Sequence, residues 1–550
     1  TPKYIVNLKT VKQRLRRIWL RSRDPEDKKE FNKMTHLMNN EMWKVKNERL
    51  EKYIKTLDAT PASEYSLWKA TKYLKRPNTY NPPLFNSKIN KWAKSDKQKA
   101  ELFANHLENV FKPNSLPKAK KEDITIELNQ EELLEKEKTI PHFSFGEVSK
   151  MILKGKNKKA PGQDQITGFL LKQLPNKAIH KIVEIFNAML ELEHIPIHFK
   201  EAVIILFHKS GKPSKLPSSY RPISLLSSIA KLFERLYLPR LLKVIDAKKI
   251  IPDQQFGFRK KHSTLEQLHR VTNFIEKALE NGHYCAAAFL DVAQAFDKVS
   301  HKLLIQMLAK LIPKCHVNLL KAYLEGRFFK VRVGEDLSVP KPILAGVPQG
   351  SVLGPLLYLL FTSDIPQPVR NSLLGKYADD TTYLTAHKSQ EVAVEILEEN
   401  LKNVEKWKDA KDIKMNTEKT VYKVFSNSII KNLPIRFCNT IIKMSNIAKY
   451  LGLNLDTKLK WKEHIKIKRD ECKYKISRLR WLIGSKSRLS LDNKILLYKQ
   501  LIRPMWAYGS QIWGCAAPTH INLIQKLQNI TLRRMVSAMM LERNADIHRD

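Results

Sequence analysis

The chain has 550 residues, 43% of them hydrophobic, so it is a globular protein too long for a single core. Lys and Arg number 98 against 55 Asp and Glu, which gives a formal net charge of +43. Nucleic acid is the polyanion that best explains this excess, because neutralising its phosphates releases counterions. The longest apolar run, 352–361, is too short to cross a bilayer, so we expect no membrane partner.

The N-terminal region is basic and helical in pattern. Residues 1–60 hold 16 Lys and Arg against 8 Asp and Glu, and apolar residues recur at helical spacing over 11–20 and 31–57. A proline-rich linker and a further helix, 97–110, follow. We predict a basic helical extension with its linker over 1–120, which is either a solvated helical pair or an RNA-binding element.

An acidic segment then reverses the sign of the charge. Residues 121–138 contain seven acids and three bases, which predicts a connector over 121–140. Further along, 202–207 reads as a buried strand, and the loop after it is basic. Ser263 to Glu266 has the pattern of a capping box that opens a helix.

Two acidic positions carry the chemistry. Asp291 lies near the end of the apolar run 285–292, which is typical of a buried strand, and Ser300 is a plausible N-cap of the helix that follows. Asp379 and Asp380 lie at the tip of a predicted hairpin. Adjacent carboxylates held close together repel, and a divalent metal with oxygen ligands such as Mg²⁺ relieves that repulsion. If the two elements pair in one sheet, three carboxylates converge on a two-metal site for phosphoryl transfer; the alternative is an ordinary acidic turn.

A glycine-rich loop and a basic C-terminal region complete the pattern. Residues 345–351 form a tight loop before an apolar helix, with Ser351 as its expected N-cap. Between 457 and 503 there are 15 Lys and Arg against 4 acids, arranged opposite apolar helical stripes. This region is either a helical surface laid along a duplex or a solvated face.

These blocks together resemble the reverse transcriptases of non-LTR (LINE-type) retrotransposons, most closely the jockey-like group. The blocks that carry the resemblance, in chain order, are 159–164 (KAPGQD), 220–225 (YRPISL), 255–259 (QFGFR), Asp291, 345–351 (AGVPQGS), 377–380 (YADD) and 450–453 (YLGL). The resemblance implies an α/β right-hand polymerase fold. Its fingers and palm would occupy 141–435, and 436–550 would hold a primer-grip hairpin and a basic helical thumb.

The resemblance also implies an RNA-directed DNA polymerase that copies element RNA from a primer 3′-hydroxyl, with two Mg²⁺ ions (Mn²⁺ is possible), a DNA primer or target, and dNTPs. Asp291, Asp379 and Asp380 would hold the metals. Among the nucleotide-binding residues, Lys209 and Arg221 would contact the triphosphate, and Lys419 would lie near the pyrophosphate. Gln349 would lie against the sugar and base of the nucleotide, and Phe296 would exclude nucleotides that contain ribose. The template and primer contacts would be Gln255, Gly257, Arg259, Gly452, Lys466 and Lys473.

For several of these residues the alternative is a purely structural role: Lys209 in an ordinary basic turn, Phe296 in the core and Lys419 at a helix end. The alternative function is a maturase-like or degenerate reverse transcriptase that acts as an RNA-binding protein. The five cysteines lack zinc spacing, so reduced thiols and the expected partners predict a cytoplasmic and nuclear protein. The start at Thr1 leads us to expect an upstream endonuclease.

Overall fold

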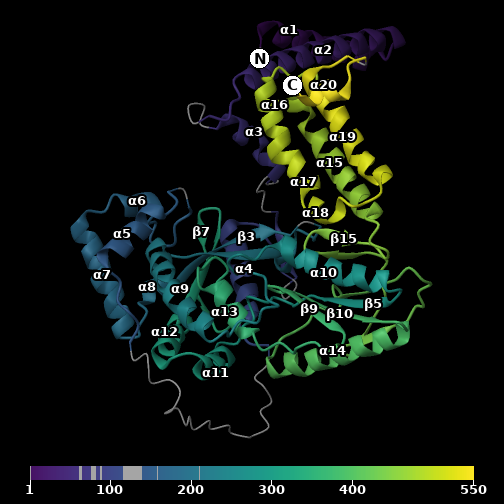
Figure 1. Ribbon diagram of the computed structural model, residues 1–550. Coiled ribbons are helices and arrows are strands. Elements are labelled where there is room, and N and C mark those ends of the chain that lie inside the picture. The colour runs from purple at the N-terminus through teal and green to yellow at the C-terminus, as the bar shows by residue number, and fades with distance from the viewer. Residues whose placement is uncertain are drawn as a thin grey trace. The chain divides into compact units, whose positions relative to one another are not determined.

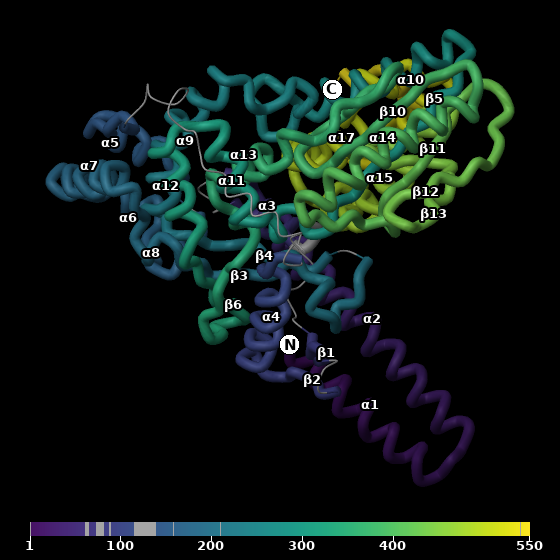
Figure 2. The backbone as a smooth tube through the Cα atoms, turned by 90° about the horizontal axis from the view of Figure 1, so that it is seen from below, coloured from purple at the N-terminus to yellow at the C-terminus, as the bar shows by residue number. Residues whose placement is uncertain are grey.

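The computed structural model describes residues 2–60, 65–75, 82–86, 90–114, 139–157, 159–209, 211–539 and 541–549. It consists of two compact units (Figures 1 and 2). One comprises Asn81–Leu459, and the other joins Thr1–Tyr80 to Lys460–Asp550. Nearly all of the predicted acidic connector lies outside the described residues.

The strands next to Asp291, Asp379 and Asp380 belong to a four-stranded antiparallel sheet in the order β11-β5-β10-β9. These strands are Val421–Phe425, Tyr284–Leu290, Asp380–His387 and Ser372–Tyr377 respectively. Ala286, Ala288 and Leu290 of β5 face α14 (Gln390–Ala410), and the small side chains of the two alanines let the helix pack closely. Helix α10 (Thr264–Glu280) covers the other face (Figure 1). The predicted buried strand, hairpin and capping box at Ser263 are all present.

A second sheet is formed by strands that precede and follow β5 in the chain. Its order is β4-β3-β6-β7, and β8 also pairs with β6. The strands are β3 Glu201–His208, β4 Tyr220–Leu225, β6 Arg327–Val333, β7 Asp336–Leu337 and β8 Lys341–Ile343. Helix α4 (Asp96–Val110) packs on this sheet through a continuous apolar face that includes Phe103 and Leu107.

Residues 82–114 therefore differ from the extension that we expected over 1–120. Lys298 Nζ donates to the carbonyls of Asn109 and Lys112 at the end of α4, at 3.2 and 2.8 Å. The Leu344 and Ala345 amides both donate to Phe111 O. These partners belong to the unit Asn81–Leu459, so α4 is an integral part of that unit. Of the extension expected over 1–120, only the residues up to Tyr80 belong to the helical unit.

Helices form the rest of this unit around a shared core. They are α5 Phe145–Lys154, α6 Gly168–Lys172, α7 Asn176–Glu191, α8 Ile197–Lys200, α9 Ser228–Ala247, α11 His301–Leu311, α12 Lys314–Leu324 and α13 Gly354–Phe361. The short hairpins are β1 Leu84–Asn86 with β2 Lys91–Ala93, β12 Ile435–Phe437 with β13 Thr440–Ile442, and β14 Ala448–Tyr450 with β15 Leu453–Leu455.

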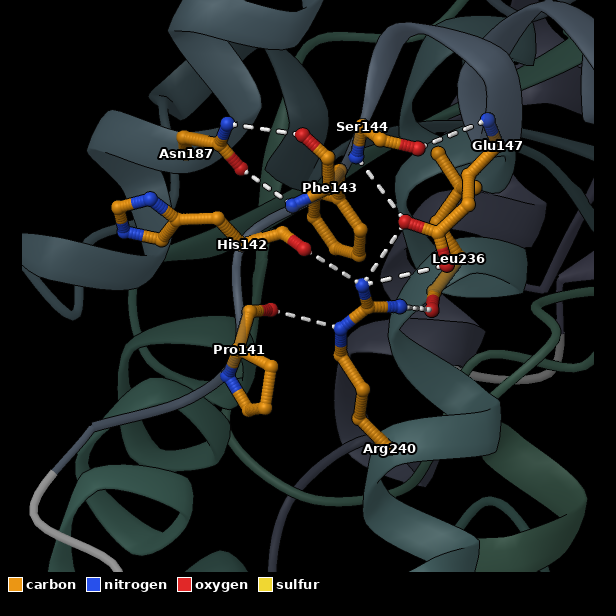
Figure 3. Close-up of polar contacts among 8 residues, drawn as sticks. All are labelled: Pro141, His142, Phe143, Ser144, Glu147, Asn187, Leu236 and Arg240. Atoms are coloured by element: carbon orange, nitrogen blue, oxygen red, sulfur yellow. Dashed lines mark hydrogen bonds and ion pairs between the residues drawn. The ribbon is translucent and has the colours of Figure 1, made fainter.

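Arg240 fastens the segment 141–147 to α9 (Figure 3). Its guanidinium donates to Pro141 O and His142 O, both at 2.7 Å, and pairs with the Glu147 carboxylate at 3.1 Å. It also lies over the Phe143 ring, 4.4 Å from the centroid. One cation thus satisfies several backbone carbonyls where no regular secondary structure does so.

The second unit is helical, and the two ends of the chain share its core. Its helices are α1 Lys3–Ser22, α2 Pro25–Lys55, α3 Ser66–Lys75, α15 Lys462–Ile483, α16 Leu491–Leu497, the π-helix Tyr498–Ile502, α17 Arg503–Ala507, α18 Ser510–Trp513, α19 Pro518–Val536 and α20 Asn544–Arg549. Ile54, Leu57 and Leu67 pack with Cys472 and Leu479. Asn493 Nδ2 donates to Leu57 O at 3.3 Å. None of the helices in the described part of the chain is long and apolar enough to cross a membrane.

Candidate active site

The sheet register brings the two acidic positions to one edge. Thr381 pairs with Leu290, so Asp291 follows the end of β5 beside the start of β10. Asp380 pairs with Tyr377, and the chain reverses through Ala378 and Asp379. Partial desolvation, and then the charges of Asp379 and Asp291, raise the pKa of Asp380 to about 6. Desolvation also raises the pKa of Asp379, and the charge of Asp291 adds to the shift.

The three carboxylates have the donor chemistry of a site for hard divalent cations. They supply oxygen ligands alone, and their mutual repulsion is what a bound cation would relieve. Within the described ranges, however, no three Asp, Glu, His or Cys side chains are already gathered into a metal-binding cluster. Lys419 Nζ lies 3.4 Å from Asp291 Oδ2 and provides part of the compensating charge.

The turn that carries Lys419 is fixed to the same strand end. The Asn416 amide donates to Asp291 O at 2.8 Å, and the Asp291 amide donates to Thr420 Oγ1 at 3.4 Å. The turn that carries Lys419 is thus hydrogen-bonded to both the amide and the carbonyl of Asp291, and this holds Lys419 next to the Asp291 carboxylate.

Two further cations approach from the second sheet. Arg221 pairs with Phe207 across β3 and β4, and Lys209 follows β3. Desolvation, and then the charges of Arg221 and Lys419, lower the pKa of Lys209. Arg221 in turn counteracts the raised pKa of Asp379. Lys209 thus interacts electrostatically with both Arg221 and Lys419, and Lys419 also pairs with Asp291.

The glycine-containing loop is anchored to the strand that bears Arg221. The Ser224 amide donates to Gln349 O at 2.8 Å, and Gly350, with φ of 119°, has its α-carbon so close that a β-carbon would lie 2.6 Å from Ser224 O. Gln349 Nε2 donates to Asp297 Oδ1 at 2.7 Å. Asp297 thereby orients the side-chain amide of Gln349.

Phe296 lies in an aromatic cluster next to the acids. Its ring stacks on Tyr358, with centroids 4.5 Å apart and planes at 25°, and meets Phe258 edge-on at 6.2 Å. The Val347 amide donates to Phe296 O at 2.8 Å, so the backbones of Phe296 and the Gln349 loop are joined. Burial raises the pKa of Tyr358, and the nearby charges of Asp379 and Asp380 add to the shift.

The residues expected to touch the template have a different environment. Gln255 is 1% exposed, and its Oε1 accepts from the amides of Gly257 and Ala378, both at 2.8 Å. Arg259 donates to Pro252 O at 3.0 Å and to Gln255 O at 3.3 Å, so it closes its own loop. These contacts hold the catalytic hairpin and leave no side-chain group of Gln255 at the surface.

Gly452 shapes the hairpin of β14 and β15. With φ of 89°, and Leu451 at 41°, it makes a two-residue turn in which both residues are left-handed. Tyr450, which precedes this turn, accepts a hydrogen bond from Gln267 Nε2 at 3.2 Å; burial raises its pKa, and the charge of Asp380 adds to the shift. This hairpin therefore lies close to the catalytic carboxylates.

The helical unit contains a basic groove of about 490 Å³ between α15 and α19. Ile476, Ile483, Leu527 and Ile530 give it an apolar floor. Its basic lining residues are Arg469, Lys473, Arg480, Lys526 and Arg534. Lys473 was predicted; Lys526 and Arg534 were not, because the sequence beyond 514 showed no interpretable pattern. Lys466 is exposed on α15 outside the groove lining.

Residues 208–455 match the family described as reverse transcriptase (RNA-dependent DNA polymerase). The chain is 38% identical to a probable RNA-directed DNA polymerase from transposon X-element and 39% identical to that from transposon BS, both of Drosophila melanogaster. It is 37% identical to the RNA-directed DNA polymerase from mobile element jockey of the same species.

These three alignments cover 99–100% of this chain but only 60–61% of the relatives, so the chain spans about three fifths of their length. Among solved structures, an apo telomerase from Candida Tropicalis matches with a TM-score of 0.34 and 15% identity, covering 52% of this chain and 59% of that one. A likeness this low supports no inference about the present chain.

Proposed function

We propose that this chain, which carries the reverse transcriptase domain of a non-LTR retrotransposon, copies RNA into DNA by extending a primer. The resemblance and the α/β polymerase fold predicted from the motif blocks are both confirmed. The observation that carries the proposal is geometric. The sheet register puts Asp291 at the same edge as Asp379 and Asp380, and Lys419 Nζ lies 3.4 Å from Asp291 Oδ2.

Divalent metal dependence is a general property of this family. Asp291 and Asp379, with Asp380 beside them, are the residues that would hold two Mg²⁺ ions or Mn²⁺. Bound there, such ions supply activation of the primer hydroxyl and stabilisation of the pyrophosphate.

The other side chains bind and position the nucleotide. Lys209 contributes a point charge to the triphosphate and Arg221 a planar guanidinium suited to bidentate contact. Lys419, which pairs with Asp291 at 3.4 Å, is placed to exchange this partner for a phosphate oxygen. Phe296, backed by Tyr358, would contact C2′ of a dNTP and leave no room for a 2′-hydroxyl.

The helical unit would bind the template and primer. Five basic residues line the groove between α15 and α19, and none of the lining residues in the described part of the chain is acidic. Phosphate neutralisation by such a surface provides affinity without sequence preference. The same groove favours the second candidate function, an RNA-binding or maturase-like protein, because it does not depend on the acidic cluster. Either function is compatible with the predicted cytoplasmic and nuclear location.

The test is primer extension on a pre-annealed RNA template with dNTPs and Mg²⁺. We expect template-dependent extension by the wild-type chain, none by Asp379→Ala, and wild-type extension by Asp336→Ala, which removes an exposed acid of β7. A salt-dependent RNA complex without extension, under Mg²⁺ and Mn²⁺ alike, would leave the RNA-binding function instead.

A further inference from the structure

The hairpin that carries Asp379 and Asp380 is bound to a buried amide from another segment. We propose that Gln255 is a positioning residue that holds this turn in its catalytic conformation, with Gly257 allowing the contact. The inference rests on the proposed polymerase function and replaces the direct template contact that the sequence predicted for these two residues.

Gln255 acts on the turn through one atom. Its Oε1 accepts from the Ala378 amide at 2.8 Å and from the Gly257 amide at 2.8 Å. The side chain thereby bridges two backbone segments that lie more than 100 residues apart. Gln255 is 1% exposed, so water does not compete for these hydrogen bonds. Its Nε2 has no hydrogen-bond partner among the described residues, which makes acceptance the function of this side chain.

The backbone next to Gln255 reinforces the attachment. Gln255 forms an isolated parallel bridge with Lys376, and the Phe256 amide donates to Lys376 O at 2.9 Å. The segment 255–257 therefore extends the hairpin on the side of β9, immediately before the turn. Two hydrogen bonds connect this segment to the hairpin, from the Ala378 amide and to Lys376 O, and a third, from the Gly257 amide, closes the segment on itself.

The turn needs this support because its backbone is unusual. Ala378 has φ of 56°, a left-handed conformation that residues with a β-carbon rarely adopt. It is followed by two acids that repel each other and Asp291. An amide fixed by Gln255 opposes relaxation of both the strained residue and the repelling carboxylates.

Gly257 is required by contact distance. A β-carbon at this position would lie 2.2 Å from the Ala378 amide nitrogen and 2.9 Å from Tyr377 C. Any larger residue would push segment 255–257 away from the turn, and the hydrogen bond from Ala378 would break. The absence of a β-carbon at Gly257 and the hydrogen bond to Gln255 therefore both keep segment 255–257 against the turn at Ala378.

We therefore expect the turn to lose its order when either residue changes. Gln255→Met keeps the length of the side chain and removes the acceptor. Gln255→Glu keeps an acceptor oxygen, and burial beside the repelling acids favours the protonated, neutral form of its carboxyl, so the variant adds no charge to the turn. Gly257→Ala introduces the clash. Gly146→Ala is the matched control, because its β-carbon would meet no atom within 4 Å.

The first measurement is hydrogen–deuterium exchange at the Ala378 amide relative to the amides of β10. We expect faster exchange at Ala378 in Gln255→Met and Gly257→Ala, with β10 unchanged, and wild-type protection in Gln255→Glu and Gly146→Ala. Exchange at Ala378 as slow in Gln255→Met as in wild type refutes the inference. This readout needs no polymerase activity, so it stays informative if the proposed function fails.

The second measurement is primer extension with varied dNTP and Mg²⁺. Loss of a residue that supports metal-binding side chains typically costs roughly 10–100-fold in activity or metal affinity. We expect a kcat lower by that factor in Gln255→Met, a higher Mg²⁺ requirement, and an unchanged KM for dNTP, with kcat restored by Gln255→Glu. A raised Kd for the RNA–DNA duplex at unchanged kcat would return Gln255 to the template-contact interpretation.

Discussion

Asp297 gives a prediction whose size follows from its surroundings. The carboxyl is 7% exposed, and burial raises its pKa to about 6 although Gln349, Lys209, Lys298 and Arg221 all oppose the shift. The ordinary value is 3.8, so the difference is about 2 units, or about 3 kcal/mol at ~1.4 kcal/mol per unit. The folded state binds the proton more tightly than the unfolded state does.

The direction of the pH effect follows. The stability contributed by the protonated form is fully present below pH 3.8 and is lost as the pH rises through about 6. At pH 8 the ionised Asp297 therefore lowers the free energy of unfolding by about 3 kcal/mol. Asp297→Asn removes the charge and keeps an Oδ1 acceptor for Gln349 Nε2, so this cost disappears.

The assay is thermal unfolding of Asp297→Asn and wild type at several pH values. With an unfolding entropy of ~2.1 cal/mol/K per residue and a unit of about 380 residues, 3 kcal/mol raises Tm by about 4 °C at pH 8. About half of that advantage should be gone at pH 5. Asp336→Asn, in exposed β7, controls for a general effect of charge. An advantage that is absent at pH 8, or equal at both pH values, refutes the reasoning.

Three further predictions concern the proposed activity. Phe296→Val should admit rNTPs, and the ratio of kcat/KM for dCTP and CTP should fall by roughly 10²–10⁴-fold; an unchanged ratio in a folded, active variant would make Phe296 a packing residue. Asp291→Ala should abolish extension but leave RNA binding intact, because it removes negative charge; a gel-shift titration beside the extension assay checks both halves. Lys473→Glu, Lys526→Glu and Arg534→Glu together should flatten the log–log salt dependence of duplex binding, since each phosphate contact contributes a slope of roughly −0.7 to −0.9; an unchanged slope would make the groove an ordinary solvated surface.

The elements whose signals are local were predictable from the sequence. The run before Asp291, the hairpin at Asp379 and Asp380 and the capping box at Ser263 each have a period or a cap within a few residues. The expected N-cap at Ser351 was wrong, since α13 begins at Gly354. Ser351 Oγ does accept from the Gly354 amide, but the buried carboxylate of Glu234 accepts from the Val352 and Leu353 amides.

What the sequence could not show are contacts between distant segments. The pairing of Asp297 with Gln349, the attachment of Gln255 to Ala378 and the capping of α4 by Lys298 leave no periodic trace, because each joins residues that are 50 or more positions apart. The same holds for the helical unit. Amphipathic stripes near both ends of the chain were visible, but a stripe does not specify its partner.

The shared core of Thr1–Tyr80 and Lys460–Asp550 has a consequence for biosynthesis. A ribosome that adds ~5–20 residues per second needs roughly 20–80 s to make the segment between them. During that time Ile54, Leu57 and Leu67 have emerged, but Cys472 and Leu479, which cover them in the finished protein, have not yet been made. The apolar side chains of Ile54, Leu57 and Leu67 therefore stay uncovered throughout that time, so their burial is among the last steps in the folding of this chain.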